Sequence, residues 1–169
     1  VDQTCSTAAS RGHLEALQWA RAAGFPWGRT SHRAAWAGHL EILQWVRAQD
    51  PPCPWDQDTS TMAAAGGHLT VLQWLHAKGC PMAIVCHVAA VNGYLPILQW
   101  AHTVGLRCHK PSATSYDVAA AGHLDVLRWL RAQNPTFAWN KGTRAIATLN
   151  GHTAVVQWLD ENGCAPTTR

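Results

Sequence analysis

Histidine, glutamate and tryptophan side chains recur at fixed places along this sequence, and side chains of these types can perform chemistry. The segment "GHLEILQW" at 38–45 has close copies at 12–19, 67–74, 93–100, 122–129 and 151–158. A histidine can act as an acid, a base or a metal ligand, and a row of tryptophans can stack on nucleic-acid bases. Catalysis, however, needs different groups that converge on one point. The repetition instead supplies the same groups once per copy, which favours an architectural role.

A histidine follows the glycine in every copy except the fourth, where Tyr94 takes its place: His13, His39, His68, His123 and His152. Helices that pack side by side lie about 10 Å apart, whereas zinc binds a histidine nitrogen at about 2 Å. Histidines from successive copies are therefore too far apart to share a metal ion. Because Tyr94 fills the same position, imidazole is not required there, and we expect these side chains to make hydrogen bonds at a turn.

Cysteines and their neighbours form one further set of potential zinc ligands. A zinc site needs four convergent Cys or His ligands, and the best local set is Cys80, Cys86, His87, Cys108 and His109. These residues fall in one predicted helix and in loops at the ends of successive copies, without a Cys-x-x-Cys pair. We therefore predict no metal and no cofactor. The six cysteines are expected to be free thiols, since no secretion signal is visible.

Motifs typical of enzymes are missing from the sequence. It has no Gly-x-Ser-x-Gly, no phosphate-binding glycine-rich loop and no His-Glu-x-x-His. The carboxylates are scattered, and Glu15 and Glu41 repeat one solvent-facing position rather than forming a pair. We predict that the protein is not an enzyme and has no small-molecule substrate.

The composition is that of a folded domain. Apolar residues make up 47% and charged residues 14% of 169 residues, and the net charge of +3 argues against a dedicated nucleic-acid binder. No apolar run is long enough to span a membrane, and the first ten residues lack the pattern of a signal peptide. We expect an intracellular, cytoplasmic protein.

The glycines of the six copies, at 12, 38, 67, 93, 122 and 151, recur at spacings of 26 or 29 residues. Such self-similarity is typical of a solenoid, in which each unit buries its apolar face against its neighbours. With the glycine as position 0, positions +4, +5 and +8 are small or branched apolar residues. These offsets lie on one face of a helix. Position +7 is always tryptophan, which we expect to join this face in the core.

The residues around this face predict two helices per copy. Threonine at −8, found in five copies, would cap the first helix. Gly, Asn or Asp at +12 would end the second. We predict one all-α domain, residues 1–169, a solenoid of six helix-turn-helix repeats with these bounds: 3–28, 29–57, 58–83, 84–112, 113–141 and 142–169.

The pattern Ala-Ala-x-x-Gly-His-Leu-Glu-Ile/Val-Leu, followed by an apolar helix, resembles the ankyrin repeat over essentially the whole chain. Its tryptophan-rich "GHLEvLQW" style is similar to short ankyrin-like repeats of protist and large-DNA-virus proteins. The Thr-Pro-Leu-His opening of the family is missing, and its period of about 33 residues is shortened in the loops between repeats. The resemblance implies a non-catalytic scaffold that binds another protein on the concave face of the array.

On that face lie positions −5 and −2, the least repetitive helical positions of the chain. Exposed aromatic and arginine side chains are typical anchors of interfaces. The predicted partner-binding residues are Arg33, Trp36, Met62, Val88, Val91 and Asp117 on the helices, with Trp27, Trp55 and Trp139 in the loops. Two alternatives stay open: the helical residues could pack between repeats, and the loop tryptophans could fold back over the helix ends.

Two other functions also stay open. A row of basic residues at +9, namely Arg21, Arg47, His76, His102 and Arg131, could bind nucleic acid from the convex side. A steep loss of affinity with salt would reveal such binding. Alternatively, the chain is a structural segment of a longer array, since Val155, Val156 and Trp158 would leave an apolar end face uncovered.

The assignment of the +7 tryptophans to the core predicts the effect of Trp100→Ala. Removing a core tryptophan costs about 3–5 kcal/mol, so the variant should melt at a much lower temperature. An unchanged melting temperature in thermal denaturation would contradict the assignment.

Overall fold

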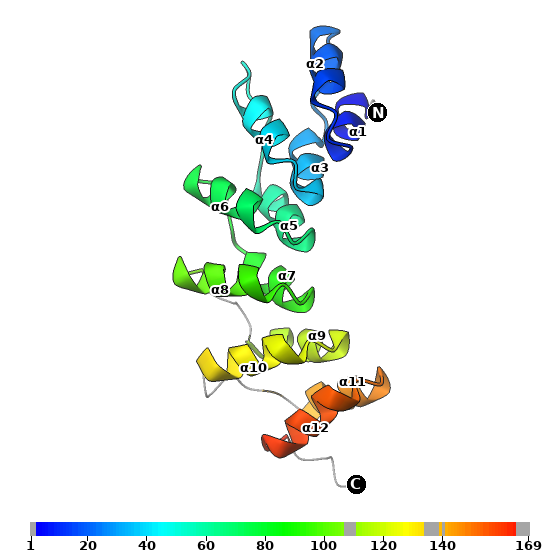
Figure 1. The fold of residues 1–169 in the computed structure, drawn as a ribbon, viewed down its shortest axis with the longest axis vertical. Coiled ribbons are helices and arrows are strands. Elements are labelled where there is room, and N and C mark those ends of the chain that lie inside the picture. Colours follow the sequence, from blue (N-terminus) through cyan, green and yellow to red (C-terminus); the bar gives the residue numbers. More distant parts are fainter. Residues whose placement is uncertain (1–2, 107–110, 134–138, 140, 165–169) are drawn as a thin grey trace. The chain divides into compact units, whose positions relative to one another are not determined.

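The fold is all-helical throughout the part of the chain that the computed structural model describes, which comprises residues 3–106, 111–133, 139 and 141–164. Figure 1 shows its twelve helices, which follow one another as six pairs without an intervening strand in those ranges. The helices are α1 Thr4–Ser10, α2 Leu14–Ala22, α3 Thr30–Ala37, α4 Leu40–Arg47, α5 Gln57–Ala65, α6 Leu69–Ala77, α7 Val85–Val91, α8 Leu95–Thr103, α9 Pro111–Ala121, α10 Leu124–Gln133, α11 Lys141–Leu149 and α12 Thr153–Glu161. Each pair corresponds to one predicted repeat.

The helix pairs belong to two compact units, Val1–Val85 and Cys86–Arg169. The division lies close to the predicted boundary between the third and fourth repeats. Within the first unit, α3 packs against α1 and α5, and within the second, α9 packs against α11. First helices of successive repeats are therefore neighbours. None of the described helices combines the length and apolar character needed to cross a bilayer.

The two alanines before each glycine explain how these first helices approach so closely. Ala34 and Ala35 in α3 are fully buried, as are Ala63 and Ala64 in α5. A side chain of one carbon keeps the two backbones near each other. The second helix supplies the larger core side chains at +5 and +8, and Leu43 and Val46 have no exposed surface.

The predicted turn at the glycine is confirmed. Gly38 ends α3 with a backbone φ of 79°, a left-handed conformation that glycine adopts without steric cost. His39 follows as the N-cap residue of α4, and its backbone N–H donates to the carbonyl of Ala34 at 2.9 Å. The chain reverses direction within three residues, which places the second helix of each pair against the first.

The threonine at −8 is not the N-cap residue of the first helix, so that part of the prediction is wrong, but the Thr59 hydroxyl does accept a hydrogen bond from the backbone N–H of the N-cap Asp56 at 3.3 Å. Thr30 lies inside α3, one residue after the N-cap Arg29, and its hydroxyl donates to the carbonyl of Trp27. In α5 the cap is Asp56, whose carboxylate accepts hydrogen bonds from the backbone N–H groups of Asp58 and Thr59. Thr30 and Thr59 are fully buried, so this position faces the interior of the stack as well as the start of the helix.

The tryptophans at +7 lie at the edge of the core and not within it. Trp19 is 65% exposed, and the other five are half-buried. The helical period explains the difference, since +7 is about 100° away from the buried position +8. For the half-buried Trp100, the expected cost of Trp100→Ala therefore falls to roughly 1–3 kcal/mol.

The histidine of each repeat lies directly on the glycine of the repeat before it. A Cβ atom added at Gly38 would come within 2.5 Å of the His68 ring, and one at Gly122 within 2.6 Å of His152. Gly12 and Gly93 meet the next histidine in the same way. The glycine is therefore required both for its backbone conformation and because the histidine ring occupies the space of a side chain.

Hydrogen bonds join the same two repeats at this point. His68 Nε2 donates to the carbonyl of Trp36 at 3.0 Å, and His152 Nε2 donates to that of Ala120 at 3.0 Å. Both acceptors are the −2 residue of the preceding repeat. The histidines thus make turn hydrogen bonds, as predicted, and these bonds cross from one repeat to the next.

The double requirement at the glycine can be measured by comparing Gly38→Ala with Gly24→Ala. Both glycines have positive φ, 79° and 84°, so both variants should lose about 1–2 kcal/mol through backbone strain. Only Gly38 meets a histidine, whereas a Cβ at Gly24 would have nothing within 4 Å. We expect Gly38→Ala to lose about 1–3 kcal/mol more in chemical denaturation. Equal losses would show that the histidine contact is unimportant.

Candidate functional site

The loop tryptophans fold over the helix ends, where an arginine of the same repeat covers them. The Arg21 guanidinium lies 4.0 Å from the centroid of Trp27. On its other side Trp27 meets Trp45 edge-on, with ring centroids 6.0 Å apart. Trp27 is only 9% exposed. The arrangement is a clamp that stabilises the junction between the first and second repeats.

The same clamp recurs at two other junctions. Arg47 covers Trp55 at 4.1 Å, and Trp55 meets Trp74 at 5.6 Å. In the second unit, Arg131 covers Trp139 at 4.5 Å, and Trp139 meets Trp158 at 5.3 Å. The sequence itself indicates this pairing of arginine with tryptophan, because the three repeats that have arginine at +9 are the three that have a loop tryptophan.

The three arginines of the basic row at +9 belong to these clamps. Arg21, Arg47 and Arg131 are half-buried, and Arg47 also donates to the carbonyl of Cys53 at 2.8 Å. His102 contacts Trp129 at 5.5 Å. These side chains hold loops and rings in place, so they do not form a solvated row.

The first unit brings three of the predicted partner-binding residues together. Arg33 and Trp36 on α3 and Met62 on α5 line one cavity of about 220 Å³. Trp36 is 51% exposed, Arg33 is exposed and Met62 is half-buried. Arg29 and His32 complete the lining. Sequence analysis missed these two residues because they lie outside the −5 and −2 positions.

In the second unit, the predicted residues are less exposed. Val88 and Val91 on α7 and Asp117 on α9 are all half-buried. Asp117 lies 3.7 Å from the ring of His87, which also contacts the Thr114 hydroxyl at 3.1 Å. Position −2 of the last repeat carries the most exposed large apolar side chain described, Leu149 at 81%.

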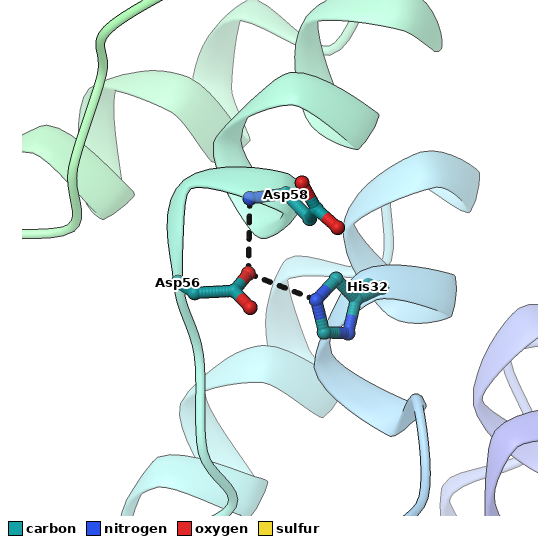
Figure 2. Close-up of side chains that lie close together, drawn as sticks. All are labelled: His32, Asp56 and Asp58. Atoms are coloured by element: carbon teal, nitrogen blue, oxygen red, sulfur yellow. Dashed lines mark hydrogen bonds and ion pairs between the residues drawn. The ribbon is translucent and has the colours of Figure 1, made fainter.

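A histidine and two aspartates meet beside the cavity of the first unit, as Figure 2 shows. The potential ligand atoms of His32, Asp56 and Asp58 lie within 4.8 Å of one another. His32 Nε2 donates to Asp56 Oδ1 at 2.9 Å, and the same oxygen accepts from the N–H groups of Asp58 and Thr59 at 2.9 and 3.3 Å. These bonds cap α5, and all three use the same oxygen of the Asp56 carboxylate.

These contacts also set the ionisation of Asp56. Partial desolvation raises the pKa of the carboxyl, but hydrogen bonds from His32 and the two backbone N–H groups, with attraction to His32, outweigh it and lower the pKa. The carboxylate is therefore favoured in the folded protein.

The zinc candidates proposed from the sequence belong to different parts of the chain. Cys80 follows α6 in the first unit, and Cys86 and His87 are in α7. Cys108 and His109 lie outside the described residues. The described cysteines are buried and form no disulfide with one another: Cys5, Cys53, Cys80, Cys86 and Cys164.

Comparison with known proteins supports the repeat architecture. Residues 5–47 match the family model for ankyrin repeats (many copies). The crystal structure of the human ASB11 ankyrin repeat domain is similar to this fold, with a TM-score of 0.71 and 15% sequence identity, over 98% of this chain and 86% of that one. No curated protein sequence gives a significant match.

The cap of α5 predicts the effect of Asp56→Ala. Loss of an N-cap side chain costs about 1–2 kcal/mol. Because the folded pKa is lowered, the carboxylate stabilises the fold above the unfolded pKa of about 4, and this stability is lost as the pH falls below it. Denaturation from pH 7 to 3 should therefore show a weaker acid dependence in Asp56→Ala. Asp58→Ala is the control, with an expected loss of about 0.5 kcal/mol. Equal losses in the two variants would contradict the capping role.

Proposed function

We propose that this chain, whose residues 5–47 match the ankyrin-repeat model and whose fold is similar to an ankyrin repeat domain, is a non-catalytic scaffold that binds another protein on the concave face of its repeats. Ankyrin repeats are generally protein–protein interaction modules, and the fold is typically non-catalytic. The binding residues we propose are those at the −5 and −2 positions. The exposed Arg33 and Trp36 on α3 and the half-buried Met62 on α5 support this choice.

The observation that carries the proposal is the exposure of Trp36. The recurring glycine, histidine and alanine residues are committed to contacts between repeats, whereas Trp36 occurs once at its position and is 51% exposed. Its neighbours Arg33 and Met62 share its cavity. Tryptophan and arginine dominate binding energy at interfaces, and a rigid helix presents them at little entropic cost.

The other proposed residues contribute unequally. Val88, Val91 and Asp117 extend the proposal to the second unit, with Leu149 as an additional exposed side chain. Trp27 is buried in its clamp, so we leave it out of the binding surface. Trp55 and Trp139 offer a partner only the part of each ring that their clamps leave exposed.

The two alternative functions receive less support. The arginines of the convex row stack on tryptophans, which leaves them less available to phosphates. The last repeat carries an exposed ion pair, with Arg144 donating to Asp160 at 2.5 and 2.9 Å. That polar pair makes its surface less suited to stacking a further repeat. We infer an intracellular location from the free thiols of the described cysteines.

The proposal is tested by affinity capture with the double variant Trp36→Ser, Met62→Ser. Specific partners should be depleted at least about tenfold, as expected when two interface anchors are truncated. Trp19→Ser is the matched control, since Trp19 is 65% exposed but lies on a second helix. Circular dichroism would verify that the variants fold. An identical set of partners for the wild type and the double variant would contradict the proposal.

A further inference from the structure

We propose that the cavity lined by Arg29, His32, Arg33, Trp36 and Met62, called here the α3–α5 pocket, binds a short peptide motif of the partner in which an apolar side chain is followed by a carboxylate. This inference rests on the proposed function and specifies the chemistry of its partner. The apolar side chain contacts Trp36 and Met62, and the carboxylate of an Asp or Glu pairs with Arg33.

The size of the α3–α5 pocket favours a single side chain. Its volume is about 220 Å³, below the roughly 300–1,000 Å³ of typical small-molecule sites. The partly exposed Trp36 ring and the Met62 side chain provide apolar surface on two neighbouring helices. Methionine adapts its shape to different apolar groups, so the pocket accepts a large side chain such as phenylalanine or leucine.

The charge of the pocket favours an anion. Arg33 is exposed, and its guanidinium group has no ion-pair or hydrogen-bond partner among the described residues. A guanidinium group can bind a carboxylate through two parallel hydrogen bonds. Arg29 also lines the pocket, and its ion pair with Asp58 is long, 3.7 Å, with both side chains exposed to solvent. An incoming carboxylate therefore meets one unpaired cation and one weakly paired cation.

The two acidic residues beside the pocket do not cancel this preference. As Figure 2 shows, Asp56 points to His32 and to the start of α5. Asp58 lies within ion-pair distance of Arg29, at 3.7 Å. Neither aspartate lines the pocket. Both are paired with groups of their own unit, while Arg33 is not, so the remaining unbalanced charge at the pocket is positive.

Peptides that differ in one side chain test this proposal. The probes are acetylated and amidated Gly-Gly-Phe-Glu-Gly, its Gln counterpart and its Lys counterpart, titrated into the full chain and followed by the NMR signal of the Trp36 indole N–H. We expect the Glu peptide to shift this signal saturably, with a dissociation constant of about 1 mM for so short a ligand. The Gln and Lys peptides should bind at least about tenfold more weakly.

The variant Arg33→Gln should bind the Glu and Gln peptides equally, whereas the control Arg128→Gln, an exposed arginine on α10, should keep the preference. Equal binding of Glu and Gln peptides by the wild type, preference for Lys, a preference that survives Arg33→Gln, or no saturable shift up to roughly 10 mM would each overturn the proposal. If partners are still lost by Trp36→Ser, Met62→Ser in those cases, the scaffold function stands and only the carboxylate motif is rejected.

Discussion

The contact between a histidine ring and the glycine of the preceding repeat is the constraint on which the stack depends. Two independent reasons require glycine at this position, as at Gly38 and Gly122. Its φ is positive, and the histidine ring lies where a Cβ atom would be. The same rings donate to the carbonyl of the −2 residue, at Trp36 and Ala120. Turn geometry, close approach and hydrogen bonding therefore coincide in one pair of residues, and this pair sets how one repeat lies on the next.

The other recurring residues follow from that spacing. Paired alanines such as Ala34 and Ala35 allow the first helices to approach, and the arginine–tryptophan clamps cover the loops on the opposite side. Residues with these roles are not available to a partner. The side chains at positions −5 and −2 take no part in the glycine–histidine contact, the alanine packing or the clamps, and they vary from repeat to repeat. In the function we propose, binding and stability are divided between different faces of the same short helices, so that a repetitive sequence can carry a specific surface.

Much of the fold could be predicted from the sequence because its determinants are local. The glycine turn and the six helix pairs follow from spacing and hydrophobic periodicity. Periodicity identifies a face but does not separate its centre from its edge, so Trp100 was assigned to the core although it is half-buried. The cap of α5 does not follow from the repeat pattern, because no other repeat has an aspartate at the position of Asp56. For the candidate site, the pattern identified Arg33, Trp36 and Met62, but Arg29 and His32 join them only through the packing of α3 on α5.

The central claim is that the histidine and the preceding glycine act as one unit, and a double-mutant cycle with Gly122→Ala and His152→Ala tests it most directly. Removing the ring should relieve the clash that the alanine creates. The unfolding free energies should therefore be non-additive, with the double variant more stable than the sum of the single losses by at least about 1 kcal/mol. Additive losses, within about 0.5 kcal/mol, would contradict the account and show that the two residues stabilise the stack independently.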